Sequence, residues 1–412
     1  MKNDAMQRRA GRRKTFSIIF CVTVLVAWLP ARGRAQVNSG SNGSDGALDF
    51  SAINYSTNIV IDMHDHPNGI YQYTYVNIPS GVTVSFIPNA NNTPVYWLVQ
   101  SNVVINGTVN VAGLSVNTAQ CCITQGGAAG PGGWPGGNGG TSGGGGQGLG
   151  GGAAGLRSGC SASHANPVSC NGTEAAYGND FLISLLGGSG GGGATDPSPG
   201  LGGGGGGGAI LIATSTQIQL FGSISAVGGN GFAYNPSSYL VYSGNGSGGA
   251  VRLVASKLTG NGIINVSGGS QGQGDASSGF IRFDTYDNEF RGTILGVFTQ
   301  GSQFIIIPTS GQLPQLTVTS VGGVPVSASP TGVLSTPDAV LSSQQNNPIP
   351  VVVSCANLPL NTQIAVSVKP ANGAAVSATG YNTGTLASST ATFSINMPRG
   401  GGLIYATAAT SN

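Results

Sequence analysis

Charged residues are densest in the segment RFDTYDNEFR, Arg282 to Arg291, which holds Asp284, Asp287 and Glu289 between two arginines. Two carboxyl groups at a defined separation could hydrolyse a glycosidic bond, and a base beside an arginine could deprotonate a polyuronate. The alternation favours surface ion pairing instead, with Arg282 and Asp284 on one outward strand face and Asp287 and Glu289 at a corner. No nucleophile, base and orienting group occur together, so the sequence assigns no catalytic residue.

A second candidate is the stretch NIVIDMHDHPNG, in which Asp62, His64 and His66 occupy alternate positions. In a continuous strand these side chains would share one face, about 7 Å apart. Two imidazoles and a carboxylate can hold a divalent metal. The Pro-Asn-Gly turn that follows favours a solvated strand face, so we assign neither a metal site nor a cofactor.

Tyr71, Tyr73 and Tyr75 also alternate along the sequence. A row of tyrosine rings on an open face can stack on sugars while the hydroxyls stay hydrated. The same row would serve equally well as cross-strand packing. The sequence leaves both interpretations open.

The first 35 residues are typical of a secretory signal peptide. A basic head precedes the apolar stretch Phe16 to Leu29, and Gly33-Arg34-Ala35 offers a cleavage site. The apolar stretch is too short for a spanning helix, so we expect no transmembrane span in the mature chain. Beyond residue 35 there are seven basic and twelve acidic residues, a net charge of −5. This balance argues against nucleic acid as a partner.

Cysteine usage agrees with export, since an exported chain is expected to pair its thiols. Cys160 and Cys170 bracket a short polar loop and are the favoured disulfide, although Cys121 or Cys122 could compete for either partner. Cys355 lies in an expected strand and should be a small buried core residue.

Four segments repeat a common pattern, beginning at Val95, Ala209, Ala250 and Phe280. An internal glycine follows each start by 12 or 13 positions, at Gly107, Gly222, Gly262 and Gly292. A looser copy runs from Tyr75 to Asn89. One such unit cannot bury its apolar face alone, so the repeat predicts coils stacked in a parallel β-helix. The alternative is a two-sheet antiparallel sandwich.

Between the first two repeats lies a glycine-rich insertion, residues 126–208, in which 35 of 83 residues are glycine. Such a segment could be a flexible linker. It could also form extended polyglycine strands packed beside the solenoid. Its interior piece AAYGNDFLISLLGG, residues 175–188, could be a short helix lying over a sheet.

After residue 312 the glycine runs stop and Ser, Thr, Val and Pro dominate. About seven short strands at near-regular spacing predict an immunoglobulin-like β-sandwich over residues 313–412. The expected strands are Gln315–Val321, Val324–Ala328, Ile349–Ala356, Gln363–Val368, Gly373–Thr379, Thr390–Met397 and Leu403–Ala408. This part would follow a β-helix domain at 36–312 and cap its exposed end.

Three stretches carry a family resemblance: SDGALDF followed by YVNIPSGVTVSFIPNANNTPVYWLVQSNVVINGTVNVAG, then GGGGGGGAILIA, then GSGGAVRLVASKLTGNGIINVSGG. They resemble a widespread group of secreted glycine-rich bacterial proteins. The resemblance covers about Ser44 to Gln300 and, with the tail, nearly the whole mature chain. It implies a pectin-lyase-like right-handed β-helix followed by a C-terminal immunoglobulin-like domain. It brings no catalytic residue with it, because its motifs are corners and strands.

The sequence therefore predicts an exported, non-catalytic protein, secreted or held at the cell surface, structural or adhesin-like in role and with polysaccharide as its candidate ligand. The alternative is a carbohydrate-active enzyme, a polysaccharide lyase or glycoside hydrolase on the same scaffold, because parallel β-helices host both reactions. A third reading is a passive spacer whose polyglycine region packs between copies.

Overall fold

The computed structural model describes most of the chain after residue 36. The described ranges are 37–53, 55–116, 124–141, 143–170, 172–196, 200–235, 239–306, 314–327, 330, 336–371 and 375–408. The predicted signal peptide, Cys121 and Cys122 lie outside them. Within these ranges the chain is all-β, with one short 3-10 turn, η1 (Met63–Asp65). No helix among the described residues is long and apolar enough to cross a bilayer.

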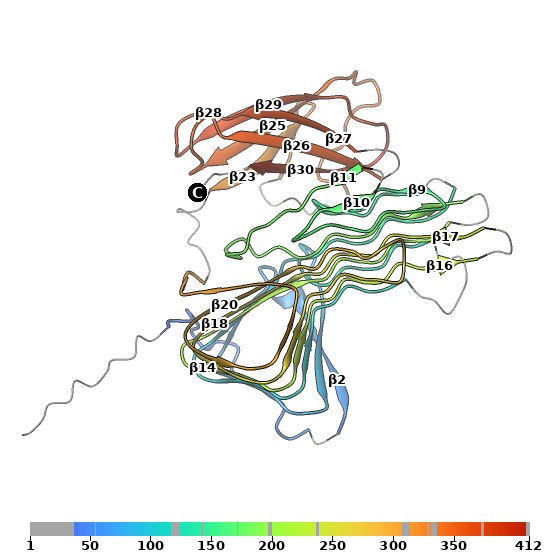
Figure 1. Cartoon of the computed structure of the whole chain (residues 1–412). Helices are drawn as coiled ribbons and strands as arrows, with labels where there is room; N and C mark the ends of the chain where they lie inside the picture. Colours follow the sequence, from blue (N-terminus) through green and yellow to red (C-terminus); the bar gives the residue numbers. More distant parts are fainter. Residues whose placement is uncertain are drawn as a thin grey trace, which may run out of the picture. The chain divides into compact units, whose positions relative to one another are not determined.

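Two parallel sheets are formed by successive coils of the chain (Figure 1). The larger sheet contains β1 (Ala47–Asp49), β3 (Ile70–Tyr73), β4 (Tyr75–Ile78), β6 (Val95–Val99), β7 (Val103–Ile105), β13 (Ala209–Thr214), β14 (Gln217–Leu220), β18 (Ala250–Gly260), β20 (Phe280–Phe290) and β22 (Val297–Gly301). The smaller sheet contains β2 (Thr57–Asp62), β5 (Val82–Ile87), β8 (Thr108–Asn110), β15 (Ser223–Ser225), β19 (Ile263–Asn265) and β21 (Thr293–Leu295).

The four repeated segments are parallel neighbours in the larger sheet. Ala209 pairs with Ala250 and Ala250 with Phe280, whereas Val95 pairs with Ile210, one residue further than the sequence alignment places it. The internal glycines form a column, because a Cβ at Gly222 would lie 1.9 Å from the carbonyl oxygen of Gly107. The corresponding distances are 2.2 Å from Gly262 to Gly222 and 2.0 Å from Gly292 to Gly262. Only glycine lets consecutive coils approach this closely.

Aliphatic side chains fill the space enclosed by the coils. In the smaller sheet Val84, Val109, Ile224, Ile264 and Ile294 pair in succession and form one column. The first four are fully buried. Burial of each such side chain contributes about 1.5 to 3 kcal/mol, so the stacked coils supply the core that a single coil lacks.

The outer face of the larger sheet is covered as well. Leu182, Leu185 and Ile306 form a second cluster with Leu211 and Val254, which point away from the interior. β13 is consequently buried at every position, which explains its continuous apolar sequence AILIAT. The segment 175–188 does reach this sheet, but it forms turns, bends and irregular backbone rather than the short helix that was one interpretation of its sequence. Gly178 at φ +79° and the Gly187-Gly188 pair at the end of the segment disfavour a helix.

The segments between coils form what we name the glycine bundle: 111–116, 126–139, 143–153, 159–163, 187–193, 202–208, 226–231, 243–249, 266–269 and 276–279, whose traces run side by side in Figure 1. Its central segment, Gly203 to Gly208, donates hydrogen bonds in three directions. The amides of Gly203 and Gly206 donate to the carbonyl oxygens of residues 137 and 134. Those of Gly204 and Gly207 donate to the carbonyl oxygens of 244 and 247, and those of Gly205 and Gly208 to the carbonyl oxygens of 114 and 111. The direction repeats every three residues, as in a polyproline-II helix with three residues per turn.

The carbonyl groups of the central segment complete the pattern. Those of Gly203 and Gly206 accept from 127 and 130, those of Gly204 and Gly207 from 191 and 188, and that of Gly205 from 229. The segment therefore has six hydrogen-bonded neighbours. A Cβ at Gly206 would lie 1.9 Å from the oxygen of Gly188, so only glycine fits. This is the geometry of extended polyglycine packed beside the coils, and it differs from that of a flexible linker.

The C-terminal region, residues 314–408, contains two antiparallel sheets. One has β23 (Gln315–Val321), β24 (Val324–Pro325), β25 (Ile349–Ala356), β28 (Thr383–Gly384) and β29 (Ser389–Ile395), and the other has β26 (Gln363–Pro370), β27 (Val376–Tyr381) and β30 (Gly402–Ala408). The sheets share a core that includes Val351, Val353, Val366 and Phe393. The seven expected strands fall on β23 to β27, β29 and β30, with ends shifted by a few residues, and Cys355 is buried and unpaired.

Short two-stranded pairings complete the described strands: β9 (Gly155–Leu156) with β12 (Ala194–Thr195), β10 (Val168–Cys170) with β11 (Gly172–Glu174), and β16 (Ala233–Tyr234) with β17 (Val241–Tyr242). β9, β12, β16 and β17 belong to loops that leave the glycine bundle.

Candidate functional site

The densest charge cluster is partly buried, which corrects one prediction. Arg282 and Asp284 do not face solvent: Asp284 is fully buried and Arg282 nearly so. The Asp284 carboxylate accepts hydrogen bonds from Arg252 Nε at 3.0 Å, Arg282 Nη2 at 2.9 Å and the Gln303 amide at 2.9 Å. The strand alternation is as expected, but the outer face of the sheet is covered by segments far away in the sequence.

Arg252 completes this buried group. Its Nη2 donates to the carbonyl oxygen of Gln303 at 2.6 Å, while Nη1 has no hydrogen-bond partner in the described part of the chain. Burial lowers the pKa of Arg252, and the Asp284 charge opposes this effect. The Phe181 ring lies 5.1 Å from the Arg282 guanidinium carbon. The ion group thus ties the covering segments to the sheet, and Asp284 is inaccessible to a substrate.

The two remaining acids of the cluster form surface ion pairs. Asp287 and Glu289 lie within β20, rather than at a corner, and both contact Lys257 on the neighbouring strand β18. The distances from Lys257 Nζ are 3.1 Å to Asp287 Oδ2 and 2.6 Å to Glu289 Oε1. Hydrogen bonds to Glu289 and Asp287 raise the pKa of Lys257. Both carboxylates therefore share one cation, and neither is a free carboxylate.

Asp62, His64 and His66 do not share a strand face. β2 ends at Asp62, which caps η1 by accepting from the His64 amide and also contacts the His64 ring. His66 turns towards Asp45, 3.4 Å away, and stacks on Tyr71 with ring centroids 4.1 Å apart. No group of three metal-ligating side chains is found in the described ranges.

The tyrosine row serves packing. Tyr71 and Tyr73 are buried in the core, where Tyr73 contacts Trp97 edge to face at 6.0 Å. Burial raises the pKa of Tyr71 to about 12. A bend at Thr74 separates Tyr75, which begins β4 and is half-buried. The interpretation of these rings as a sugar-stacking platform is therefore wrong for Tyr71 and Tyr73.

Cys160 and Cys170 form a disulfide. The loop that it closes holds His164, which is fully buried, stacks on Tyr177 and bonds through Nδ1 to the carbonyl oxygen of Gly248 at 2.7 Å. Burial lowers the pKa of His164 to about 4. This histidine is accordingly neutral at physiological pH.

A cluster that the sequence did not reveal lies on the loops around β9, β12 and β17. We call Leu156, Arg157, Asp196, Tyr239 and Leu240 the Arg157 cluster. The Arg157 guanidinium carbon lies 3.7 Å from the Tyr239 ring centroid, and Nε donates to Asp196 Oδ2 at 3.0 Å. Asp196 is buried, whereas the Arg157 side chain is 45% exposed.

The backbone at this position is unusual. Arg157 has φ +58°, a conformation that costs a non-glycine residue energy and often marks a functional position. Leu156 and Leu240 beside it are 73% and 47% exposed. One sequence signal could have located the cluster, since Arg157 is the single Lys or Arg of the glycine-rich insertion. Its partners are far away in the sequence and could not have been guessed.

Comparisons with known proteins add no relative: no family model, no curated protein and no solved structure matches this chain.

Proposed function

We propose that this chain is an exported, non-catalytic protein of the extracellular space or cell surface, structural and adhesin-like in role. Its domains would be a right-handed parallel β-helix at 36–312 and an immunoglobulin-like sandwich at 313–412. It would belong to the secreted glycine-rich group that its sequence resembles. The in-register coils support the β-helix part of this proposal. The Cys160–Cys170 disulfide supports export, because disulfides form and persist in oxidising compartments.

The glycine bundle carries the proposal. Over the ranges that define it, backbone groups bond to backbone groups, and few side chains remain for chemistry. A rigid, hydrogen-bonded glycine bundle suits a structural role, because it holds the loops that leave it at a fixed distance from the coils. The alternative, a polysaccharide lyase or hydrolase, would need free carboxylates in one cleft, whereas Asp284, Asp287 and Glu289 each have a basic partner.

The Arg157 cluster is the place where such a protein would contact polysaccharide. An arginine stacked on a tyrosine and fixed by a buried carboxylate loses little freedom on binding. Its planar guanidinium suits a carboxylate or sulfate group, and Leu156 and Leu240 offer apolar surface for the C–H faces of sugars. The preferred ligand class is therefore polysaccharide with isolated acidic groups, because the net charge of −5 offers one arginine here rather than the basic stripe that a dense polyanion such as nucleic acid needs.

A glycan array probed with residues 36–412 tests this function. We expect binding to uronate-containing or sulfated glycans, weakened at least tenfold by Arg157→Gln. Arg291→Gln, a matched substitution at an exposed position directly after β20, should leave binding unchanged. Absence of glycan binding, or equal binding by both variants, would refute the ligand assignment.

Turnover is measured on the same glycans, by reducing-sugar release and by the absorbance of unsaturated products. We expect none. Turnover that Asp287→Asn or Glu289→Gln abolishes would replace this proposal by the enzyme alternative. Export is tested separately, by expression of the full precursor and mass determination of the secreted chain, which should begin at Gln36.

A further inference from the structure

Residues 175–188, which we name the covering strap, lie over the outer face of the larger sheet. Leu182 and Leu185 are the buried apolar contacts of the strap. Within the described ranges, no backbone-to-backbone hydrogen bond joins residues 178–186 to the rest of the chain. A segment with so few backbone bonds can open locally while the sheet beneath it stays intact.

His164 lies beneath the start of the strap. Its ring stacks on Tyr177 with centroids 4.5 Å apart and contacts Phe280 of β20 edge to face at 5.1 Å. Nδ1 lies 2.7 Å from the carbonyl oxygen of Gly248, which can only accept, so Nδ1 carries the proton of the neutral ring. Nε2 has no hydrogen-bond partner in the described part of the chain, and a Cβ on Gly178 would lie 3.6 Å from it. Gly178 is exposed, so displacement of the strap at this point brings water to Nε2.

Protonation places a positive charge and a new N–H donor on Nε2, where the closed strap offers no acceptor. The facing Tyr177 hydroxyl donates to a backbone carbonyl oxygen, and burial raises the pKa of Tyr177, so this side chain stays neutral in acid. The glycine neighbours bring no charge. Arg282 follows Phe280 on the same face of β20, and it shares Asp284 with Arg252, which leaves an excess of positive charge on that side. A charged imidazole is therefore unfavourable under the closed strap and favourable in water.

We propose that the covering strap is an acid-sensitive latch: protonation of His164 releases Tyr177 and opens the strap, which uncovers the apolar outer face of the larger sheet. Opening exposes Leu211 and Val254, which point away from the interior of the coils. The disulfide that closes the His164 loop holds the histidine in place, so the strap is the part that moves. This device goes beyond the proposed extracellular role and does not rest on it.

The size of the effect follows from the linkage between opening and proton binding. The pKa of His164 is about 4 under the closed strap and about 6.5 for a hydrated imidazole. The open state therefore binds the proton more tightly, and the ratio of open to closed strap rises as the pH falls from 6.5 towards 4. Relative to pH 7.5, this ratio should be roughly 25-fold higher at pH 5.

Hydrogen–deuterium exchange on residues 36–412 measures the opening, with rates corrected for the intrinsic effect of pH on exchange. The amides of Tyr177 and Gly187 are hydrogen-bonded to backbone outside the strap, and their protection should fall roughly 25-fold from pH 7.5 to pH 5. The amides of β13, beneath the strap, should stay far better protected at both pH values. Unchanged exchange in the strap would overturn the proposal. So would equal protection of the strap and β13 at pH 5, because exchange would then require global unfolding.

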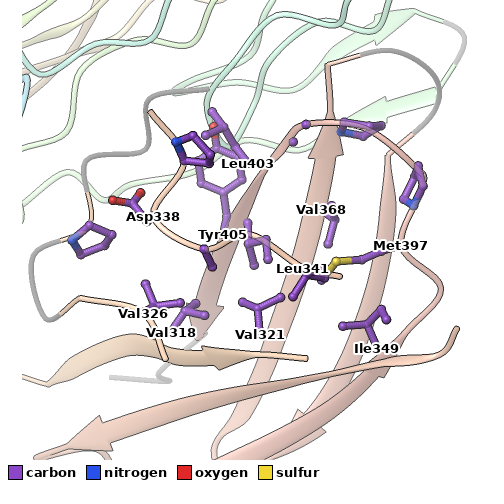
Figure 2. A pocket seen from close by; sticks show the side chains of 18 of the residues that line it. Val318, Val321, Val326, Asp338, Leu341, Ile349, Val368, Met397, Leu403 and Tyr405 are labelled. Carbon is purple, nitrogen blue, oxygen red and sulfur yellow. The ribbon is translucent and has the colours of Figure 1, made fainter. Parts of the chain in front are cut away.

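Trp134 reports the same opening by fluorescence. Its ring contacts Tyr177 edge to face with centroids 5.9 Å apart, and Trp97 is the only other tryptophan after residue 35. In a Trp97→Phe chain, the emission of Trp134 should therefore shift to longer wavelength between pH 7.5 and pH 4.5, and an unchanged spectrum would contradict the release of Tyr177. Trp134 also contacts Tyr405 of β30, which Figure 2 shows at a cavity of the C-terminal region. A shift that accompanies loss of amide protection at β30 would place the change in that region and overturn the proposal.

Three variants localise the effect. His164→Asn does not titrate, so exchange of the strap, corrected for intrinsic rates, should be equal at the two pH values. His64→Asn, the matched control at the exposed η1 turn, should keep the full change. Phe181→Ala removes a ring that lies 5.1 Å from the Arg282 guanidinium carbon, and it should raise opening at both pH values by the same factor. A pH effect that survives His164→Asn would overturn the proposal; if that variant does not fold, loss of the pH effect in Phe181→Ala would do so.

Discussion

The stacked coils and the glycine bundle are two solutions to the same packing problem. In the coils, each turn of chain lies on the next through columns of buried side chains such as Val109, Ile224 and Ile264. In the bundle, neighbouring segments contact each other backbone to backbone. The Gly188 oxygen, for example, lies so close to Gly206 that a Cβ on Gly206 would clash with it. The coils are stabilised by apolar burial, and the bundle by hydrogen bonds that satisfy nearly every peptide group of its central segment.

The two regions should therefore respond differently to mutation. Aliphatic cores accept changes of similar volume, because neighbouring side chains can shift. The glycine bundle lacks movable side chains around its central segment, so an added methyl group must displace backbone. The predictions below test this contrast, beginning with the largest expected effect.

The first prediction concerns Gly206→Ala. Its Cβ would lie 1.9 Å from the Gly188 oxygen, and relief of this clash must break hydrogen bonds on several sides. We expect a loss of about 4 kcal/mol in the free energy of unfolding, measured by denaturant titration. The control is Gly145→Ala, whose Cβ would lie 3.4 Å from the nearest oxygen, an ordinary contact. Equal losses in the two variants would disprove the explanation by backbone packing.

The same contrast explains what the sequence could reveal. The repeat with its corner glycines located the coils, because side-chain alternation and a fixed glycine leave a visible period. The seven expected strands after residue 312 were found for the same reason. The three-residue hydrogen-bond period of the central segment leaves no such mark, since every position from Gly203 to Gly208 is glycine. Flexible linker and packed polyglycine therefore looked alike in the sequence.

The sites were harder to predict than the strands. Alternation correctly placed Arg282 and Asp284 on the outer face of their sheet, but the sequence does not tell which faces are covered. The covering residues, Phe181 and Gln303, come from the insertion and from the chain after β22. The Arg157 cluster is likewise assembled from loops 39 or more residues apart, as the Arg157–Asp196 pair shows.

The second prediction tests a buried ion group on which the coils also depend. Asp284→Asn removes the carboxylate that Arg252 and Arg282 share and leaves buried positive charge uncompensated. Loss of one partner from a buried ion pair costs about 3 kcal/mol. Equilibrium unfolding in urea measures the loss. A change below about 1 kcal/mol would mean that water reaches this ion group.

The third prediction is a pH dependence that originates at His164, which bonds to the bundle through the carbonyl oxygen of Gly248. His164 has a pKa of about 4 in the folded chain and about 6.5 when unfolded, so the unfolded state binds more protons between these values. The contribution is fully present above pH 6.5 and is lost as the pH falls towards 4. At pH 5 the loss should be roughly 2 kcal/mol relative to pH 7.5. His164→Asn, which retains an N–H group near Gly248, should remove this dependence, and His64→Asn at the exposed η1 turn should retain it.

The smallest effect is expected on the strand that carries Asp284. Asp287 lies three residues further along β20, in its exposed half, and shares Lys257 with Glu289. Because solvent and salt screen exposed charges, Asp287→Asn should leave the unfolding midpoint unchanged within error, at low and at high salt. A shift comparable to that of Asp284→Asn would mean that the Lys257 group is as enclosed as the Arg252 group. The coils would then depend on polar bonding along the whole of β20, and the contrast with the glycine bundle would be one of degree.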